Sequence, residues 1–317
     1  MRRRALGLAA GLLILAFLTL GVVMGWDRVT QYDWRWQPAE AGAGFAALVA
    51  MYLMSALGYV LILEQLAGRR VPRRLFVAVW ARSILGRYVP GNVLMVASRL
   101  VLGREAGIPR RVSFAASVYE QALSLGAVAV GGVVLIAAYG ARTVGPASWL
   151  VAFVPLGLVV LHPRLFKPLT GKALQRIGRE PLEVLLSGRQ LAALLAWYTV
   201  VAVLLALGVG LVVRSAAPEA GPLVYVGLSF LASFVISMLA FVFPSGLGVR
   251  EGAFALALSR DLPAGVAIAA STGIRLVLTF AELLFVAVAV LLDWQGRRSG
   301  ARGDEEAEVS GVPADEE

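Results

Sequence analysis

Long apolar runs, separated by short basic or turn-forming stretches, dominate the hydropathy pattern of this chain. Most of the runs are at least as long as the ~20 residues that an α-helix needs to cross roughly 30 Å of hydrocarbon. A shorter run at 147–161 would need support from neighbouring helices or a locally thinner bilayer. The pattern therefore predicts membrane-spanning helices. The longer runs lie at 6–24, 43–63, 113–139, 190–213, 222–243 and 264–293.

The segment 75–103 departs from this pattern, because Pro90-Gly91 interrupts it and arginines lie on both sides of the break. Its flanks, "AGRRVPRR" and "GREAGIPRR", are both basic, and basic loops favour the cytoplasmic side of a membrane. A segment with two cytoplasmic ends must enter and leave on the same side. We therefore expect a re-entrant helical hairpin with Pro90-Gly91 at its tip, covered by other helices or by a wet cavity.

A shift of 154 residues aligns the first half of the chain with the second. Both halves then show a helix breaker, an apolar half-helix, a charged turn with proline and a long helix. The aligned pairs are Pro90 with Pro244, Pro109 with Pro263, Val112 with Val266, and Ala115-Ala116-Ser117 with Ala269-Ala270-Ser271.

This repeat resolves the topology. Each half would cross the membrane an odd number of times, so the halves must be inverted, and the hairpin around "FPSGLGVRE" enters from the outer side. The predicted fold is an all-α integral membrane protein: a polytopic helical bundle of six spanning helices plus two re-entrant helical hairpins, eight hydropathy segments in all. Residues 1–295 form the transmembrane domain, with halves at about 1–140 and 141–295, and 296–317 form an acidic disordered tail.

Composition agrees with a membrane protein and excludes several other classes. Hydrophobic residues make up 59% of the chain, more than a soluble domain of this size can bury, and the net charge is +9. Basic excess of this kind faces anionic lipid headgroups, so we expect membrane phospholipids and no nucleic acid as partners. There is no cysteine, and the single His162 has no companion ligands, so no metal and no cofactor are expected. We expect a multi-pass plasma-membrane protein with both termini in the cytoplasm.

Charged residues within the apolar segments are the candidates for function, since ionisable groups are costly inside a membrane. Half-helix N-termini after Gly91 and Gly246 add positive dipole ends suited to an anionic headgroup. Glu120 and Arg275 occupy nearly equivalent places in the two halves, and we hypothesise that they approach each other or a shared ligand. The alternative is that the charges pair structurally and hold the hairpins down. The candidate headgroup-binding residues are Arg87, Pro90, Gly91, Asn92, Arg99, Glu120, Pro244, Ser245, Gly246, Arg250, Glu251 and Arg275.

Four stretches, "LGRYVPGNVLMVASRLVLGREAGI", "ASVYEQALSL", "FPSGLGVREGAFALAL" and "STGIRLVLTFAELL", together resemble the lysylphosphatidylglycerol synthase transmembrane region. This is a flippase-like family of bacterial and archaeal membrane proteins, and the resemblance spans most of 6–293. It implies movement of polar-headed lipids or lipid-linked intermediates between leaflets. The best-known members carry a fused cytoplasmic aminoacyltransferase domain, which is not expected in the printed sequence.

The leading hypothesis is a non-enzymatic lipid translocator with a cavity between the two hairpins. Arginines would hold the lipid phosphate, while Glu120 and Glu251 would orient those arginines or contact a cationic headgroup. Two alternatives stay open: a membrane-embedded transferase with a lipid-linked donor, in which Glu120 or Glu251 is a general base, and an ion-coupled small-solute transporter. Homo-oligomerisation is left open.

Overall fold

A computed structural model describes residues 29–88, 93–140, 186–239 and 248–309, and within these ranges the regular elements are all helical. Four of the helices contain a stretch long and apolar enough to cross a membrane, as four of the predicted spans require. The predicted spans 6–24 and 147–161 lie outside the described residues. The four long helices are α3 (Pro38–Ala67), α6 (Arg110–Tyr139), α10 (Gly188–Ala216) and α13 (Ala264–Val309).

Local signals in the sequence explain where several of these helices begin and end. α3 has Pro38 in its first turn and ends at Gly68, whose φ of 66° is the left-handed conformation that glycine adopts without strain. α10 begins with a capping box, in which the Ser187 amide donates to Gln190 Oε1 (2.7 Å) and the Gln190 amide donates to Ser187 Oγ (3.3 Å). Caps of this kind provide hydrogen-bond partners for the terminal backbone N–H and C=O groups, which have no partner within the helix.

Between the long helices lie two pairs of shorter ones. The first pair is α4 (Arg73–Ile84), continued by the 3-10 turn η1 (Leu85–Tyr88), and α5 (Val93–Glu105). The second is α11 (Leu223–Leu239) and α12 (Val249–Leu258), and a 3-10 turn, η5 (Pro218–Ala220), precedes it. The two helices of each pair pack against each other.

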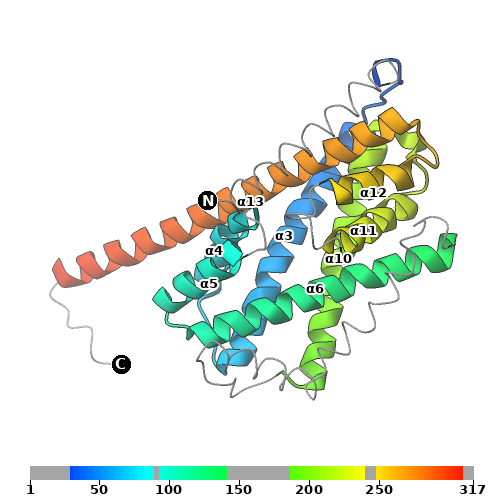
Figure 1. The fold of residues 1–317 in the computed structure, drawn as a ribbon. Coiled ribbons are helices and arrows are strands. Elements are labelled where there is room, and N and C mark those ends of the chain that lie inside the picture. The colour runs from blue at the N-terminus through cyan, green and yellow to red at the C-terminus, as the bar shows by residue number, and fades with distance from the viewer. Residues whose placement is uncertain (1–28, 89–92, 141–185, 240–247, 310–317) are drawn as a thin grey trace, which may run out of the picture.

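The packing between the two halves is reciprocal. α4 of the first half packs against α13 of the second, and α11 of the second half packs against α6 of the first. α3 and α10 pack together through small residues, since a Cβ atom on Gly44 would lie only 2.9 Å from the Gly208 carbonyl oxygen. Small residues at such crossings let helix backbones approach closely, which is typical of helices in membranes. α3 and α10 lie side by side in the bundle (Figure 1).

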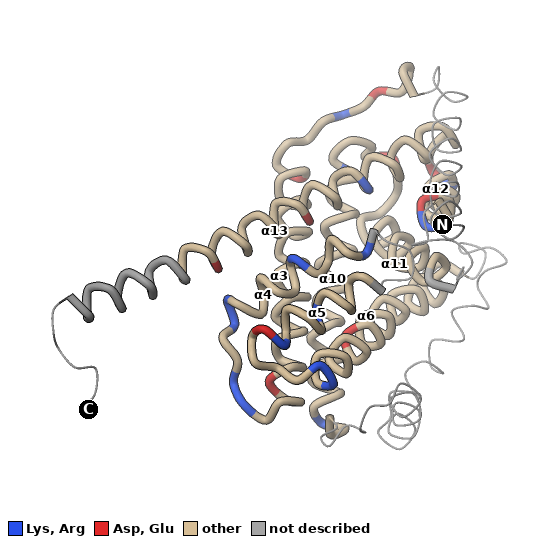
Figure 2. Tube along the Cα trace, turned by 60° about the vertical axis from the view of Figure 1, so that its left-hand side comes forward, with Lys and Arg blue, Asp and Glu red and all other residues tan. Residues whose placement is uncertain are grey.

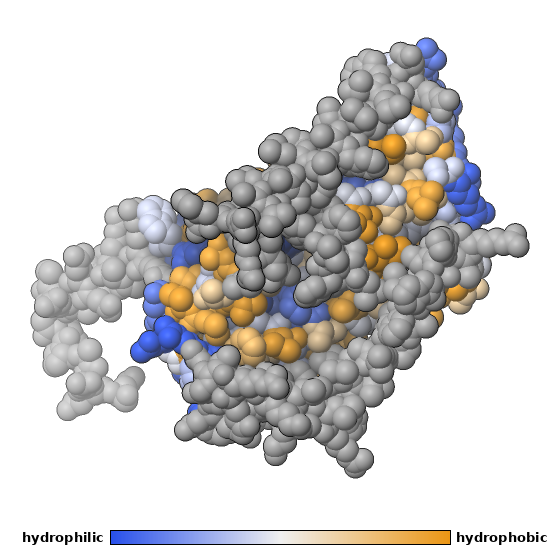
Figure 3. All heavy atoms as spheres, in the orientation of Figure 1, coloured by the Kyte–Doolittle hydropathy of each residue, from blue (hydrophilic) through white to orange (hydrophobic). Residues whose placement is uncertain are grey.

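Apolar side chains remain on the outside of this bundle. On α13 they include Leu276 (58% exposed) and Phe280 (65% exposed), and hydrophobic residues occupy much of the coloured part of the face in Figure 3. A bundle in water buries such side chains or uses them to bind a partner. Together with the length of the four helices, this surface fits a bundle surrounded by lipid.

α13 continues past residue 295, where the transmembrane domain was predicted to end. Residues 296–317 were expected to form a disordered tail, but the helix continues to Val309 and extends beyond the bundle (Figure 1). No proline lies between Pro263 and Pro313, and "EEAE" at 305–308 consists of favourable helix-forming residues, which offset the weak helix formers Gly296, Gly300 and Gly303. The remainder of the predicted tail, 310–317, lies outside the described residues.

Candidate functional site

A first group of charged and polar residues, here called the first-half cluster, joins α4, α5 and α6. It consists of Trp80, Ser83, Arg99, Ser117 and Glu120. Arg99 Nη1 forms an ion pair with Glu120 Oε2, and Arg99 Nε donates to Ser83 Oγ (2.9 Å). The indole Nε1–H of Trp80 donates to Glu120 Oε1 (2.7 Å). The cluster therefore ties both short helices of the first half to the long helix that follows them.

The first-half cluster is sealed from its surroundings and is neutral overall. Arg99 is 1% exposed and Glu120 is 3% exposed. The ring of Tyr59 covers the guanidinium, with its centroid 4.5 Å from Arg99 Cζ. A lipid headgroup cannot reach either charge in this conformation. In this conformation the ion pair ties α5 to α6.

A second group, here called the second-half cluster, consists of Gly248, Arg250 and Glu251 at the start of α12 and Ser271 and Arg275 on α13. Glu251 Oε1 accepts from Arg275 Nη1 and from Arg250 Nη2 (3.2 Å). The other carboxylate oxygen, Oε2, accepts from the Gly248 amide (2.8 Å), which is one of the unpaired donors of the helix N-terminus. Ser271 Oγ donates to the Glu251 carbonyl oxygen (2.9 Å). One carboxylate thus positions two arginines.

The second-half cluster differs from the first in charge and in access. Two guanidinium groups share one carboxylate, so its formal charge is +1. The carboxylate side chain of Glu251 is 2% exposed, whereas the side chains of Arg250 and Arg275 are 19% and 25% exposed. Phe230 lies beside Arg250, with its ring centroid 5.4 Å from Cζ. The exposed parts of the two arginines keep N–H donors that a phosphate could accept.

The two clusters lie at comparable places in the two halves. Ser117 and Ser271, which the 154-residue shift aligns, each contact the short helix that precedes their own long helix, through Arg99 (3.5 Å) and through the Glu251 carbonyl. In the first half the short helix supplies the arginine and the long helix the glutamate. In the Glu251–Arg275 pair of the second half, the short helix supplies the glutamate and the long helix the arginine.

Two further ion pairs connect α13 with α4 and η1. Arg87 Nη1 lies 3.6 Å from Glu282 Oε2, and the Tyr52 hydroxyl donates to the same carboxylate oxygen (3.2 Å). Arg82 Nη2 donates to Asp293 Oδ2 (3.0 Å). Sequence reasoning missed Tyr52 and Asp293. The position of Asp293, 18 residues and five helical turns after Arg275, was a signal that could have found it.

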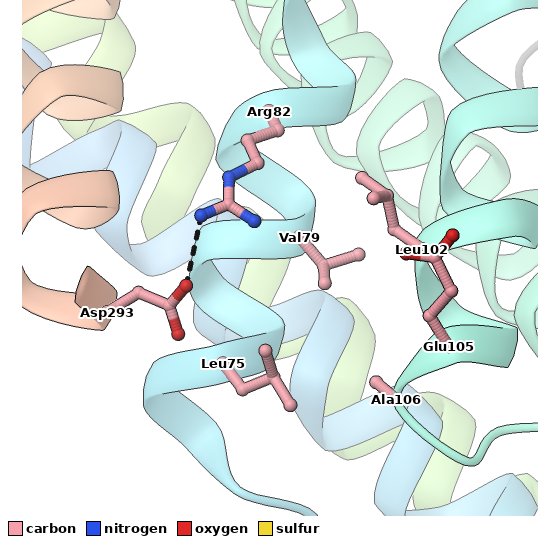
Figure 4. Close-up of a pocket in the computed structure, with 7 residues that line it drawn as sticks. All are labelled: Leu75, Val79, Arg82, Leu102, Glu105, Ala106 and Asp293. Atoms are coloured by element: carbon pink, nitrogen blue, oxygen red, sulfur yellow. Dashed lines mark hydrogen bonds and ion pairs between the residues drawn. The ribbon is translucent and has the colours of Figure 1, made fainter. Parts of the chain in front are cut away.

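A cleft of about 400 Å³ opens beside Arg82 and Asp293, lined by α4, α5 and the α13 carboxylate. Figure 4 shows Arg82 reaching towards Asp293 on one side of α4, while Val79 points towards Leu102 on the other. Four apolar and three charged side chains line the cleft. Its lining residues are Leu75, Val79, Arg82, Leu102, Glu105, Ala106 and Asp293.

Glu120 and Arg275, which were expected to approach each other or a shared ligand, form their ion pairs with other residues. In the described part of the chain Glu120 pairs with Arg99 and Arg275 pairs with Glu251, so each pair stays within its own half. The sequence gives the depth of a residue along its helix but not the rotation of that helix, and the rotation decides which partner it meets. Six predicted headgroup-binding residues lie outside the described residues: Pro90, Gly91, Asn92, Pro244, Ser245 and Gly246.

Other residues fit structural roles. Glu64 accepts from the Val71 amide (3.4 Å) and pairs with Arg73 (3.5 Å), so it secures the turn that leads into α4. The sequence pattern also did not point to Trp80 and Ser83, although both complete the surroundings of Arg99 and Glu120. Within the described ranges no group of three or more His, Cys, Asp or Glu side chains is placed to hold a metal ion.

The fold and its buried charges define a polytopic helical membrane protein. The model of the lysylphosphatidylglycerol synthase transmembrane region matches residues 4–286, and the chain belongs to this family. It is an integral membrane protein of a family related to lipid modification and lipid flipping. None of the curated proteins compared with the chain matches it.

Proposed function

We propose that this protein translocates a phosphate-bearing lipid between membrane leaflets, with the second-half cluster as its headgroup site. The observation that carries the proposal is the sharing of Glu251 by Arg250 and Arg275. This leaves a net positive, partly exposed pair of guanidinium groups on helices of an integral membrane protein. A stable positive charge at such a place favours an anionic ligand, and guanidinium groups bind phosphate oxygens through paired N–H donors.

In this proposal the two clusters have different tasks. Arg250 and Arg275 bind the lipid phosphate, and Glu251 holds both guanidinium groups in position without leaving its place at the start of α12. Arg99 and Glu120 clamp the first hairpin to α6 and do not contact the ligand. The protein is a transporter in this proposal and not an enzyme, and its partners are phospholipids or lipid-linked intermediates.

The membrane topology belongs to the same proposal. Six spanning helices and two re-entrant hairpins form an inverted repeat, with both termini on the cytoplasmic face of the plasma membrane. Two observations support it. The packing of α4 on α13 and of α11 on α6 is reciprocal. The 154-residue shift also carries the start of α6, Arg110, onto Ala264, where α13 begins.

Reconstituted protein tests the function. The full chain is placed in vesicles of phosphatidylethanolamine and phosphatidylglycerol that contain acyl-labelled fluorescent phosphatidylglycerol, and a quencher is added outside. Protein-dependent loss of the inner-leaflet signal is expected, and it should fall in Arg275→Gln but not in Arg260→Gln, an exposed arginine paired with Asp261 outside the cluster. Repeating the assay with labelled phosphatidylethanolamine shows whether a zwitterionic headgroup is accepted. If the wild-type protein moves neither lipid, the proposal is wrong, and the transferase and solute-transporter alternatives become the ones to assay.

Single cysteines test the topology independently, because the natural chain contains none. Arg104→Cys and Ser259→Cys place thiols at exposed positions near the ends of α5 and α12. An inverted repeat requires that a membrane-impermeant reagent label the first only from the cytoplasmic side and the second only from the outer side. Labelling of both from one side would contradict it.

A further inference from the structure

Three ion pairs lie in a row along one face of α13. The α13 members of these pairs are Arg275, Glu282 and Asp293, which are 7 and 18 residues apart as counted from Arg275. At about 100° per residue these spacings return to within about 20° of the same line on the helix. At ~1.5 Å per residue, the row has members about 10 Å and about 27 Å from its first residue. It therefore runs from near the middle of the predicted span 264–293 to the end of that span, and Figure 2 shows charged residues spaced along this helix.

The three pairs share one pattern of exposure. Each carboxylate side chain is buried: Glu251 is 2% exposed, Glu282 is 3% and Asp293 is 5%. Each arginine side chain is open on one side, and the exposed fractions are 25% for Arg275, 37% for Arg87 and 36% for Arg82. Glu282 and Asp293 thus hold Arg87 and Arg82 against α13, whereas Glu251 of α12 holds Arg275 of α13, and each arginine presents part of its side chain outwards.

A half-open arginine within the membrane needs a polar environment. A guanidinium facing hydrocarbon is unfavourable, so its outer side must meet water or a lipid headgroup. A guanidinium has five N–H donors, and each ion pair uses one of its terminal nitrogens, which leaves donors for a second acceptor. A phosphate is the acceptor that this geometry suits best, because one phosphate can take two donors from one arginine.

We propose that Arg275, Arg87 and Arg82 form a headgroup path along α13, on which the phosphate of a phospholipid passes from the second-half cluster to the cleft beside Asp293. The inference rests on the proposed function and adds the route to it. The second-half cluster, with its extra Arg250, is the positive end of the path. The other two pairs, Arg87–Glu282 and Arg82–Asp293, are each neutral. A phosphate can therefore bind to their arginines and leave again without a large change in binding free energy. At the far end, Leu75, Val79 and Leu102 give the cleft an apolar wall for the upper part of an acyl chain.

The path can be tested separately from the site. Arg82→Gln and Arg87→Gln are assayed in the vesicles described above, with labelled phosphatidylglycerol as the probe and Arg260→Gln as the control off the row. Binding of the same labelled lipid to the detergent-solubilised variants is measured in parallel. Each row variant is expected to slow transfer roughly tenfold, because one charge-assisted contact on the route is lost. Both should keep lipid binding within about twofold, because the second-half cluster is intact.

A double variant separates the path from simple structural damage. Arg82→Gln alone leaves the Asp293 carboxylate buried and unpaired, whereas Arg82→Gln with Asp293→Asn removes both charges. If Arg82 binds the passing phosphate, lipid transfer stays slow in the double variant. Recovery of the wild-type rate in the double variant would overturn the path, as would wild-type rates in Arg82→Gln and Arg87→Gln. If Arg82→Gln and Arg87→Gln transfer lipid at the wild-type rate while Arg275→Gln does not transfer it, the path is refuted and the proposed function stands. If the wild-type protein transfers no lipid, both are refuted.

Discussion

The first-half and second-half clusters each pair arginine with glutamate beside a serine, between a short helix and the long helix that follows it, yet they suit different tasks. In the first, Arg99 and Glu120 balance each other and are closed off by Tyr59 and Trp80. In the second, two arginines share Glu251 and remain partly open. One arginine more and a less complete cover turn an internal clamp into an arrangement suited to an anion.

The comparison also shows what the buried carboxylate does in each half. Glu120 and Glu251 are both 3% exposed, so neither is available to a ligand in this conformation. Each neutralises an arginine and fixes its orientation. What differs is the arginine, which is sealed at position 99 and partly open at positions 250 and 275. In the proposed function, the arginines of the second half therefore bind the ligand and Glu251 is a positioning residue.

The largest effect that this comparison predicts is on stability, in Glu120→Gln. Loss of the carboxylate leaves the Arg99 guanidinium charged and sealed, and breaking a buried pair in this way costs roughly 3–5 kcal/mol. Glu251→Gln should cost less, about 1–3 kcal/mol, because Arg250 and Arg275 can turn towards a polar surrounding. Denaturant unfolding in detergent micelles, followed by circular dichroism, measures both. Equal losses in the two variants would show that the clusters are equally closed and would remove the contrast between them.

The next predicted effect is a recovery of stability when both charges of the first-half cluster are removed. Arg99→Met combined with Glu120→Leu replaces both charges of the first-half cluster with apolar side chains of similar volume. Replacing a whole buried pair in this way is often neutral, but the Trp80 indole N–H loses its acceptor, so the double variant should unfold within about 1–3 kcal/mol of the wild type and closer to it than Glu120→Gln. Because the clamp does not touch the ligand, the variant should also transfer labelled lipid. A stable double variant without transfer would give Arg99 or Glu120 a direct role and contradict the assignment of the clamp.

A smaller effect, on binding, is expected in the second-half cluster. Arg250→Gln and Arg275→Gln each remove one donor group from the phosphate, which should weaken the binding of phosphatidylglycerol roughly tenfold, or about 1.4 kcal/mol. Their unfolding should change less than that of Glu120→Gln, because each leaves Glu251 paired with the other arginine. Microscale thermophoresis with labelled lipid in detergent measures the affinity, and the Arg99→Met with Glu120→Leu variant is the matched control. Unchanged affinity in both arginine variants would rule out the cluster as the headgroup site.

The helices were predictable from the sequence, whereas the partners of the charges were not. Apolar run lengths and Pro38, Pro109 and Pro263 locate the long helices because they act locally. An ion pair depends on how helices rotate and cross, which is why Glu120 was expected near Arg275 and lies against Arg99. The aligned serines at 117 and 271 were noticed as part of a repeat, but their contacts with the short helices needed coordinates.

The last and smallest prediction concerns an exposed contact that serves as a baseline for the buried ones. The Tyr32 hydroxyl, before α3, donates to Glu219 Oε2 (2.8 Å) in η5. This hydrogen bond lowers the pKa of the Glu219 carboxyl below its ordinary value. A lowered folded-state pKa means that the contact stabilises the protein above the ordinary carboxyl pKa of about 4.3 and that this contribution is lost as the pH falls through the lowered value.

Tyr32→Phe should therefore lower the unfolding midpoint slightly at neutral pH, and its difference from the wild type should shrink as the pH falls below about 4. Thermal unfolding of both proteins across this pH range is the measurement, with Glu219→Gln as a variant that should show the same loss of pH dependence. The ring of Tyr32 also lies against Trp34, with centroids 4.9 Å apart, and the phenylalanine keeps that contact. A difference that stays constant across the range would place the effect in the ring packing. A difference larger than that of Glu120→Gln would overturn the view that the sealed charge pair dominates stability, because an exposed contact is weakened by water on every side.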